Sequence, residues 1–172
     1  MSLHLATGPA ISSGRWIPIN VAQTIKTSAS GYYVNWGATS GGVIGLTYAA
    51  SSSNNRLLVM CSLTVGLDFG GRIGANLFLD GSRVNALAAD TNGNITRRTT
   101  GEHAGGSYDI SNLAFNYVNT SPSTSNADYS VRLGQGDNGN RYVYVNRPHN
   151  EPDQSYQMRG TSSITIVEFQ YS

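Results

Sequence analysis

The sequence predicts an all-β protein built as an antiparallel sandwich. Turn signals recur roughly every ten residues, and short segments that alternate with period two lie between them, as in Tyr142-Val143-Tyr144-Val145. No segment carries a sustained apolar stripe with the 3.6-residue period of a helix. Many short strands at this spacing are typical of antiparallel sandwiches and barrels.

The length of 172 residues suits one domain. We divide it into an extended N-terminal arm, residues 1–20, and a β-domain, residues 21–172. The strands that we predict are Asn20–Thr27, Tyr32–Trp36, Val43–Tyr48, Arg56–Val65, Ile73–Leu79, Ser111–Val118, Ala127–Leu133, Arg141–Val145 and Ser163–Tyr171. The polar, Gly-rich stretch Asp90–Gly106 is predicted as a long loop, a kind of segment that is usually functional or flexible.

The arm lacks apolar periodicity apart from the cluster of Trp16, Ile17 and Ile19, which we predict to dock on another protein. The alternative is a frayed terminus. The last strand, Ser163–Tyr171, is expected to lie in the middle of a sheet, because a free apolar edge invites aggregation. Thr165 and Glu168 are expected to face away from the core. The side chains that we predict to be buried are Leu58, Met60, Phe78, Phe115, Tyr129, Val143, Ile164 and Ile166.

Two segments have the composition of hairpin turns, Asp80-Gly81 and Asp137–Asn140, because Asp, Asn and Gly tolerate positive φ. Charged residues make up only 12% of the chain, about half the usual share. Neutral polar surface of this kind is typical of β-proteins that pack against copies of themselves. A net charge of +1 argues against nucleic-acid binding, and no apolar run is long enough for membrane insertion. Cys61 is the only cysteine, so an internal disulfide is excluded, and we expect it to be buried.

The titratable residues do not predict a catalytic or metal site. Glu151 and Asp153 are close in sequence, but they flank Pro152 and are a weak candidate for the carboxylate pair of a glycosidase. The three histidines are isolated from one another, and no His or Cys pair has zinc spacing. The segment Asp90–Asn94 is similar to part of a calcium loop but lacks its distal glutamate. We therefore predict no enzyme activity and no cofactor.

Tyrosines in or near loops are the better candidates for ligand contact. Aromatic rings stack on the C–H faces of sugars, and neighbouring amides and guanidinium groups bond the hydroxyls. The alternative is that these rings fill the core or a contact between subunits. The candidate glycan-binding residues are Tyr108, Tyr142, Tyr144, Tyr156 and Arg147.

An ordered set of short segments covers residues 20–170 and resembles a known family. These segments are Val21–Thr27, Leu46–Val59, Leu77–Ser82, Phe115–Thr124, Tyr129–Val131, Val143–Arg147 and Ser162–Glu168. Their order and spacing are similar to those of small modules in phage tail fibres and other virion appendages. The sequence departs from that pattern at Tyr48, where Pro is common, and at Arg56, where Lys is common.

The resemblance implies a jelly-roll fold of the tumour-necrosis-factor and complement-C1q type, assembled as a homotrimer. It implies a virion protein, assembled in the host cytoplasm, that contacts other virion proteins through its arm and the host surface or its glycans through the loops at its far end. A trimer that decorates the capsid is the second reading, and a glycan depolymerase is the third and weakest.

Overall fold

The computed structural model describes residues 14–35, 38–68, 71–85, 99–104, 109–135, 140–149 and 159–172. These residues form two antiparallel sheets. The strands are β1 (Trp16–Lys26), β2 (Ser30–Val34), β3 (Gly42–Tyr48), β4 (Arg56–Leu67), β5 (Gly71–Leu79), β6 (Ser82–Arg83), β7 (Thr100–Ala104), β8 (Ser111–Asn119), β9 (Ala127–Gln135), β10 (Arg141–Val145) and β11 (Ser162–Tyr171). The prediction of an all-β antiparallel sandwich is confirmed.

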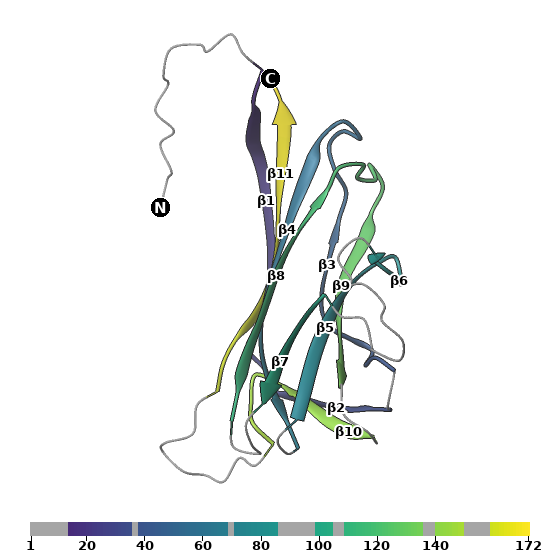
Figure 1. Cartoon of the computed structure of the whole chain (residues 1–172). Coiled ribbons are helices and arrows are strands. Elements are labelled where there is room, and N and C mark those ends of the chain that lie inside the picture. The colour runs from purple at the N-terminus through teal and green to yellow at the C-terminus, as the bar shows by residue number, and fades with distance from the viewer. Residues whose placement is uncertain are drawn as a thin grey trace.

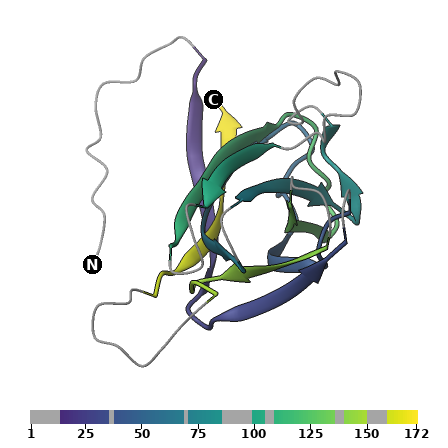
Figure 2. The same ribbon diagram turned by 60° about the horizontal axis from the view of Figure 1, so that its bottom comes forward.

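The first sheet has the order β1-β11-β4-β10-β2, with β8 on the other edge of β4. The second sheet has the order β3-β9-β5-β6, with β7 also beside β5. The chain passes repeatedly from one sheet to the other, which is the connectivity of a jelly roll. Figures 1 and 2 show the two sheets curving around a common interior. Both β2 and β10 lie at the lower end in Figure 1, and the C-terminus lies at the upper end.

The closing strand lies inside the first sheet, as predicted. Strand β11 pairs with β1 on one side and with β4 on the other, so neither of its edges is free over the paired residues. Strand β1 begins at Trp16 and pairs with Tyr171 there, so the predicted boundary of the arm at residue 20 falls inside a strand. The register of this pair shifts between Pro18 and Asn20, where proline has no N–H to donate.

The core lies between the sheets and is built from alternate residues of each strand. Tyr129, Val143, Ile164 and Ile166 are buried in it, as predicted, and Cys61 is buried as well. Phe78 is buried on the other face of the second sheet, under the guanidinium of Arg132. Phe115 is only half-buried against the core, because β8 lies at the edge of its sheet.

The prediction for β4 was wrong by one residue. Leu57, Val59 and Cys61 face the core, whereas Leu58 and Met60 lie half-buried on the opposite face of the sheet. A shift of one residue exchanges the two faces of a strand, and β4 is apolar on both faces, so its sequence does not reveal its orientation. Leu58 and Met60 therefore place apolar side chains on the side of the first sheet that faces away from the core.

Three further expectations have different outcomes. Asp80 and Gly81 form the turn between β5 and β6 with φ values of 49° and 77°, which confirms the predicted hairpin. Asp137, Asn138 and Gly139 of the other predicted turn lie outside the described residues, and the strands on either side of it, β9 and β10, belong to different sheets. The predicted loop Asp90–Gly106 contains strand β7, paired with β5, and most of its other residues lie outside the described part of the chain.

Candidate functional site

The outer face of the first sheet, on the side away from the core, carries an uncharged surface across four strands. Its first row joins Val21, Val167, Leu58 and Val118, which lie directly opposite one another on β1, β11, β4 and β8. Val21 is 62% exposed and Val118 is 49% exposed. Four aliphatic side chains thus form a continuous line across the sheet, and the two at its ends are open to solvent.

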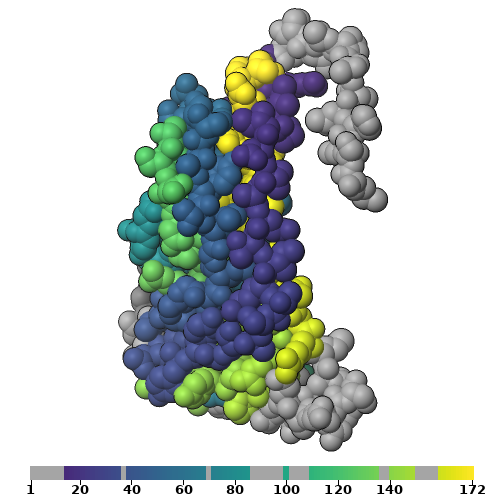
Figure 3. All heavy atoms as spheres, turned by 180° about the vertical axis from the view of Figure 1, so that it is seen from behind, coloured from purple at the N-terminus to yellow at the C-terminus, as the bar shows by residue number. Residues whose placement is uncertain are grey.

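Two more rows continue this surface downward. The second row is Gln23, Thr165, Met60 and Asn116, and the third is Ile25, Ser163, Ser62 and Ala114. We call the twelve residues of the three rows the outer face. None of them is charged. Strand β1, in purple, is the edge strand of this sheet and extends along most of the height of the molecule seen from behind (Figure 3).

The predicted attachment residues lie at the upper end of β1. The Trp16 ring packs against Tyr171 with the ring centroids 5.3 Å apart, and the Arg56 guanidinium lies 4.2 Å from the centre of the Trp16 ring. Ile17 is half-buried, and Ile19 is 45% exposed. Trp16 therefore contacts its own chain. The role of these three residues in virion attachment stays a prediction.

The predicted glycan-binding residues Tyr142 and Tyr144 lie side by side on β10, with their rings stacked at 6.2 Å and 21°. Tyr142 is 47% exposed, but Tyr144 is only 6% exposed. The Arg147 guanidinium lies 4.5 Å from the centre of the Tyr144 ring, and His149 Nδ1 lies 2.7 Å from its hydroxyl oxygen. Tyr144 therefore packs against Tyr142, and Arg147 packs against Tyr144. Tyr108 and Tyr156 lie outside the described residues.

The sequence did not single out Tyr33 as a site residue. Tyr33 lies on β2 directly opposite Tyr142, is 57% exposed, and meets the Tyr142 ring edge-on at 5.0 Å. Its neighbours Tyr32 and Val34 are apolar as well, so the sequence alone does not show which ring points outward. The pairing of β2 with β10, which are far apart in the sequence, brings Tyr33 and Tyr142 together.

Two residues fix the position of the tyrosines. Gly31 pairs with Tyr144, and a side chain at this glycine would come within 3.0 Å of the Tyr144 ring. Asn146 follows β10 with a φ of 64°, and it is fully buried. Its amide donates to the carbonyl oxygens of Lys26 and Ser28 at 2.7 and 3.1 Å, and its Oδ1 accepts from the Ser162 hydroxyl at 2.6 Å. Asn146 therefore ties the end of β10 to the β1–β2 turn and to the start of β11.

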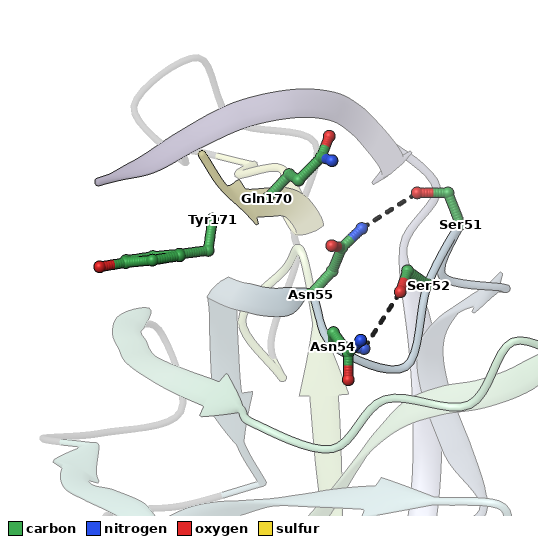
Figure 4. A pocket seen from close by; sticks show the side chains of 6 residues that line it. All are labelled: Ser51, Ser52, Asn54, Asn55, Gln170 and Tyr171. Carbon is green, nitrogen blue, oxygen red and sulfur yellow. Dashed lines mark hydrogen bonds between the residues drawn. The ribbon is translucent and has the colours of Figure 1, made fainter. Parts of the chain in front are cut away.

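A polar pocket of about 320 Å³ lies at the upper end of the molecule (Figure 4). It is lined by residues of the β3–β4 turn and of β11, namely Ser51, Ser52, Asn54, Asn55, Gln170 and Tyr171. Ser51 and Asn55 point toward each other in Figure 4, and the Asn55 amide donates to the Ser51 hydroxyl at 3.0 Å. The pocket is lined by uncharged groups, and two of its residues bind the buried carboxylate of Glu168.

Glu168 was expected to face solvent, but only 1% of it is exposed. Its position continues the inward series of Ile164 and Ile166 on β11. Oε1 accepts from the Ser51 backbone N–H and hydroxyl, both at 2.8 Å, and from the Asn55 amide at 2.6 Å. Oε2 accepts from the Tyr48 hydroxyl at 2.7 Å.

The electrostatics of this site follow from these bonds. Removal from water favours the neutral acid and raises the pKa of Glu168, but the hydrogen bonds from Asn55, Tyr48 and Ser51 outweigh this effect, and the pKa lies below its ordinary value. Burial and the neighbouring carboxylate raise the pKa of Tyr48 to about 12. The group is therefore an ionised carboxylate held by neutral donors, and it connects the β3–β4 turn to the last strand.

The described residues contain no group of three His, Cys, Asp or Glu side chains placed to hold a metal ion. Among the same residues no helix has the length and apolar character needed to cross a membrane. Asp80 acts in the β5–β6 turn and accepts from the Asp128 backbone N–H at 2.8 Å. Glu151 and Asp153, the weak candidate pair, lie outside the described residues.

No protein-family model and no curated protein matches this sequence. Among solved structures, the chain is similar to one from the structure of infectious bursal disease virus, Gx strain, with a TM-score of 0.37 and 14% identity. The match covers 96% of this chain and 44% of that one. This chain therefore spans less than half the length of that viral protein.

Proposed function

We propose that this chain is a structural protein of a bacteriophage particle, a homotrimeric jelly-roll appendage of the fibre or knob kind that contacts the host surface without catalysis. The observation that supports self-association is the uncharged outer face. Contact faces between subunits are depleted of charge, and the outer face combines an aliphatic row with neutral polar side chains. The number three, the phage particle and the fibre or knob come from the resemblance of the sequence to virion appendages.

We propose a second copy of the chain as the occupant of the outer face. Neighbours in a ring of three meet through two different surfaces, and the uncharged outer face can lie against the next copy without burying an unpaired charge. The aliphatic row offers Val21 and Val118 at its two ends, each about half or more exposed. Covering such a side chain fully contributes about 1.5–3 kcal/mol, so burial of the exposed valines favours association.

Light scattering on the purified chain tests this proposal. The expected mass is three times 18.3 kDa at micromolar concentration. Val21→Glu and Val118→Glu place a charge on the outer face and should give monomers with unchanged β-sheet circular dichroism. Ser53→Glu, an exposed position in the β3–β4 turn, is the matched control and should remain a trimer. A native monomer, or a Val21→Glu variant that stays fully assembled, would refute the proposed contact.

The position on the particle distinguishes an appendage from a capsid-decorating trimer. Imaging of particles that carry a labelled copy should place the label on the tail or on a fibre; label spread over the capsid would favour decoration. The attachment role of Trp16, Ile17 and Ile19 belongs to the same test. Because β1 begins at Trp16, deletion of residues 1–13 leaves the strand whole, whereas deletion of residues 1–20 removes part of the first sheet.

A further inference from the structure

We propose that Tyr33 and Tyr142 form a platform that binds pyranose rings of a host-surface glycan. This inference rests on the proposed role at the host surface and goes beyond it by naming the site and the ligand class. The two rings are 57% and 47% exposed and meet edge-on with their centroids 5.0 Å apart. The core beneath them is filled by other residues of the same strands, such as Val34 and Val143. The two exposed rings are therefore not needed to complete the core.

One ring of the platform, Tyr142, packs against a buried ring of its own chain. Tyr142 stacks on Tyr144, whose ring also contacts the Arg147 guanidinium and the His149 ring and is almost fully covered. Gly31 leaves the space that the Tyr144 ring occupies. Ordering of loose side chains is one of the main costs of binding, and tyrosine offers a large contact area with only two torsions to fix. A supported pair of rings therefore binds at lower entropic cost than isolated surface tyrosines.

The chemistry of the platform matches a sugar. Each ring offers an apolar face to the C–H groups of a pyranose and a phenolic hydroxyl that donates to or accepts from the sugar hydroxyls. The two side chains bring no charge, so the ligand class is an oligosaccharide recognised through neutral rings and hydroxyls. An anionic ligand would need cationic groups, and the nearby Arg147 lies over the Tyr144 ring.

The platform is separate from the outer face that we assign to self-association. The segment after β10 crosses the sheet between them, because a side chain at Gly66 would come within 2.6 Å of the Arg147 carbonyl oxygen. Below the outer face, Thr64 is likewise covered: its hydroxyl donates to the Thr161 carbonyl oxygen at 3.1 Å. A trimer built on the outer face thus leaves Tyr33 and Tyr142 available.

The test uses the full chain on a printed array of bacterial and mammalian pyranose oligosaccharides, followed by titration of the strongest glycan against four variants. Tyr33→Ala and Tyr142→Ala should each weaken binding about tenfold or more, a factor that corresponds to about 1.4 kcal/mol. Tyr33→Phe keeps the ring and should retain most of the affinity. Tyr171→Ala is the matched control, because Tyr171 is also 59% exposed but lies beside the polar pocket at the other end.

The other outcomes of the binding experiment overturn the inference. An array without signal excludes a glycan platform, and loss of binding with Tyr171→Ala alone places the site in the polar pocket. Light scattering on the same variants separates this inference from the proposed trimer. If Tyr33→Ala dissociates the assembly, the rings belong to a subunit contact and the platform is refuted. If the native chain is a monomer whose glycan binding still depends on Tyr33 and Tyr142, the trimer fails and the platform stands.

Discussion

Replacement of Glu168 by glutamine probes the buried carboxylate that joins the last strand to the β3–β4 turn. The variant keeps the size of the side chain but removes its charge and turns one acceptor oxygen into a donor. Four donated hydrogen bonds converge on the two oxygens, from the Tyr48 hydroxyl, from the Asn55 amide and from the N–H and hydroxyl of Ser51. The Tyr48 hydroxyl can rotate and accept instead, so the bonds from Ser51 and Asn55 determine the loss.

The expected magnitude follows from the strength of these bonds. A hydrogen bond to a charged group contributes about 1.5–3 kcal/mol and a neutral one about 0.5–1.5 kcal/mol, so weakening three bonds costs about 3 kcal/mol. Burying a neutral amide costs less free energy than burying an ion, and this difference offsets part of the loss from the weakened hydrogen bonds. We expect Glu168→Gln to lower the free energy of unfolding by about 2 kcal/mol, and Tm by about 4–8 °C for a chain of this size.

The pH dependence gives the decisive measurement. The folded protein holds the pKa of Glu168 below its ordinary value of 4.5, so its carboxylate stabilises the fold above that pH. This stabilisation is lost as the pH falls through the lowered pKa. Thermal unfolding at fixed protein concentration should therefore show a constant difference in Tm between the native and Glu168→Gln proteins from pH 6 to 8. This difference in Tm, the gap between the two proteins, should close below pH 4.5.

Asp128→Asn is the control for the loss of one negative charge, because Asp128 is exposed on β9 and its replacement should leave Tm nearly unchanged. Equal Tm values for the native and Glu168→Gln proteins at pH 7 would refute the reasoning. So would a gap that persists unchanged down to pH 3, because it would show that the charge of Glu168 is not the source of the stabilisation.

Two further variants test the packing and the turn. Phe115→Ala should lower the free energy of unfolding by about 2 kcal/mol, less than the 3–5 kcal/mol of a fully buried ring, because Phe115 is half-buried. Ser121→Ala, at an exposed position just after β8, is the control. An unchanged urea midpoint for Phe115→Ala would contradict its contact with the core. Gly81→Ala should lower the free energy of unfolding by about 1–2 kcal/mol, because Gly81 has a φ of 77°. Gly41→Ala is the control and should be neutral, because a side chain at Gly41 meets open space. Equal Tm values for these two variants would show that the turn tolerates a side chain.

The fold could be predicted from the sequence because its strands are short, alternating and separated by turn residues. The orientation of β4 could not, because Leu57, Leu58, Val59 and Met60 present apolar side chains to both faces. That ambiguity is informative in retrospect. A strand that is apolar on both faces in an antiparallel sheet is covered on both faces, or it is ready to be covered by another molecule.

The candidate sites were harder to predict than the fold. Glu168 follows Ile164 and Ile166 at strict period two, and this alternation predicts that its side chain faces the core. The opposite assignment followed from the rule that charged side chains face solvent. Its donors lie at Tyr48, Ser51 and Asn55, more than 110 residues away in the chain, so the hydrogen bonds that make burial possible are not visible in the sequence. Tyr33 was missed for the same reason, because its partner Tyr142 is brought to it by a long-range strand pair.

The outer face and the pair Tyr33 and Tyr142 lie at different heights of the first sheet, and the segment after β10 separates them. Asn146 fixes the position of that segment. A positive φ of 64° turns the chain sharply at the end of β10, and an asparagine tolerates this conformation better than most residues. The turn sends Arg147 over Tyr144 and across Gly66, so the same few residues support the tyrosine platform and cover the sheet beside it. The bonds from Asn146 to Lys26, Ser28 and Ser162 fix that turn to β1 and β11. Because β1 and β11 also carry the outer face, the proposed assembly surface and the proposed glycan platform are both joined to one buried side chain, Asn146.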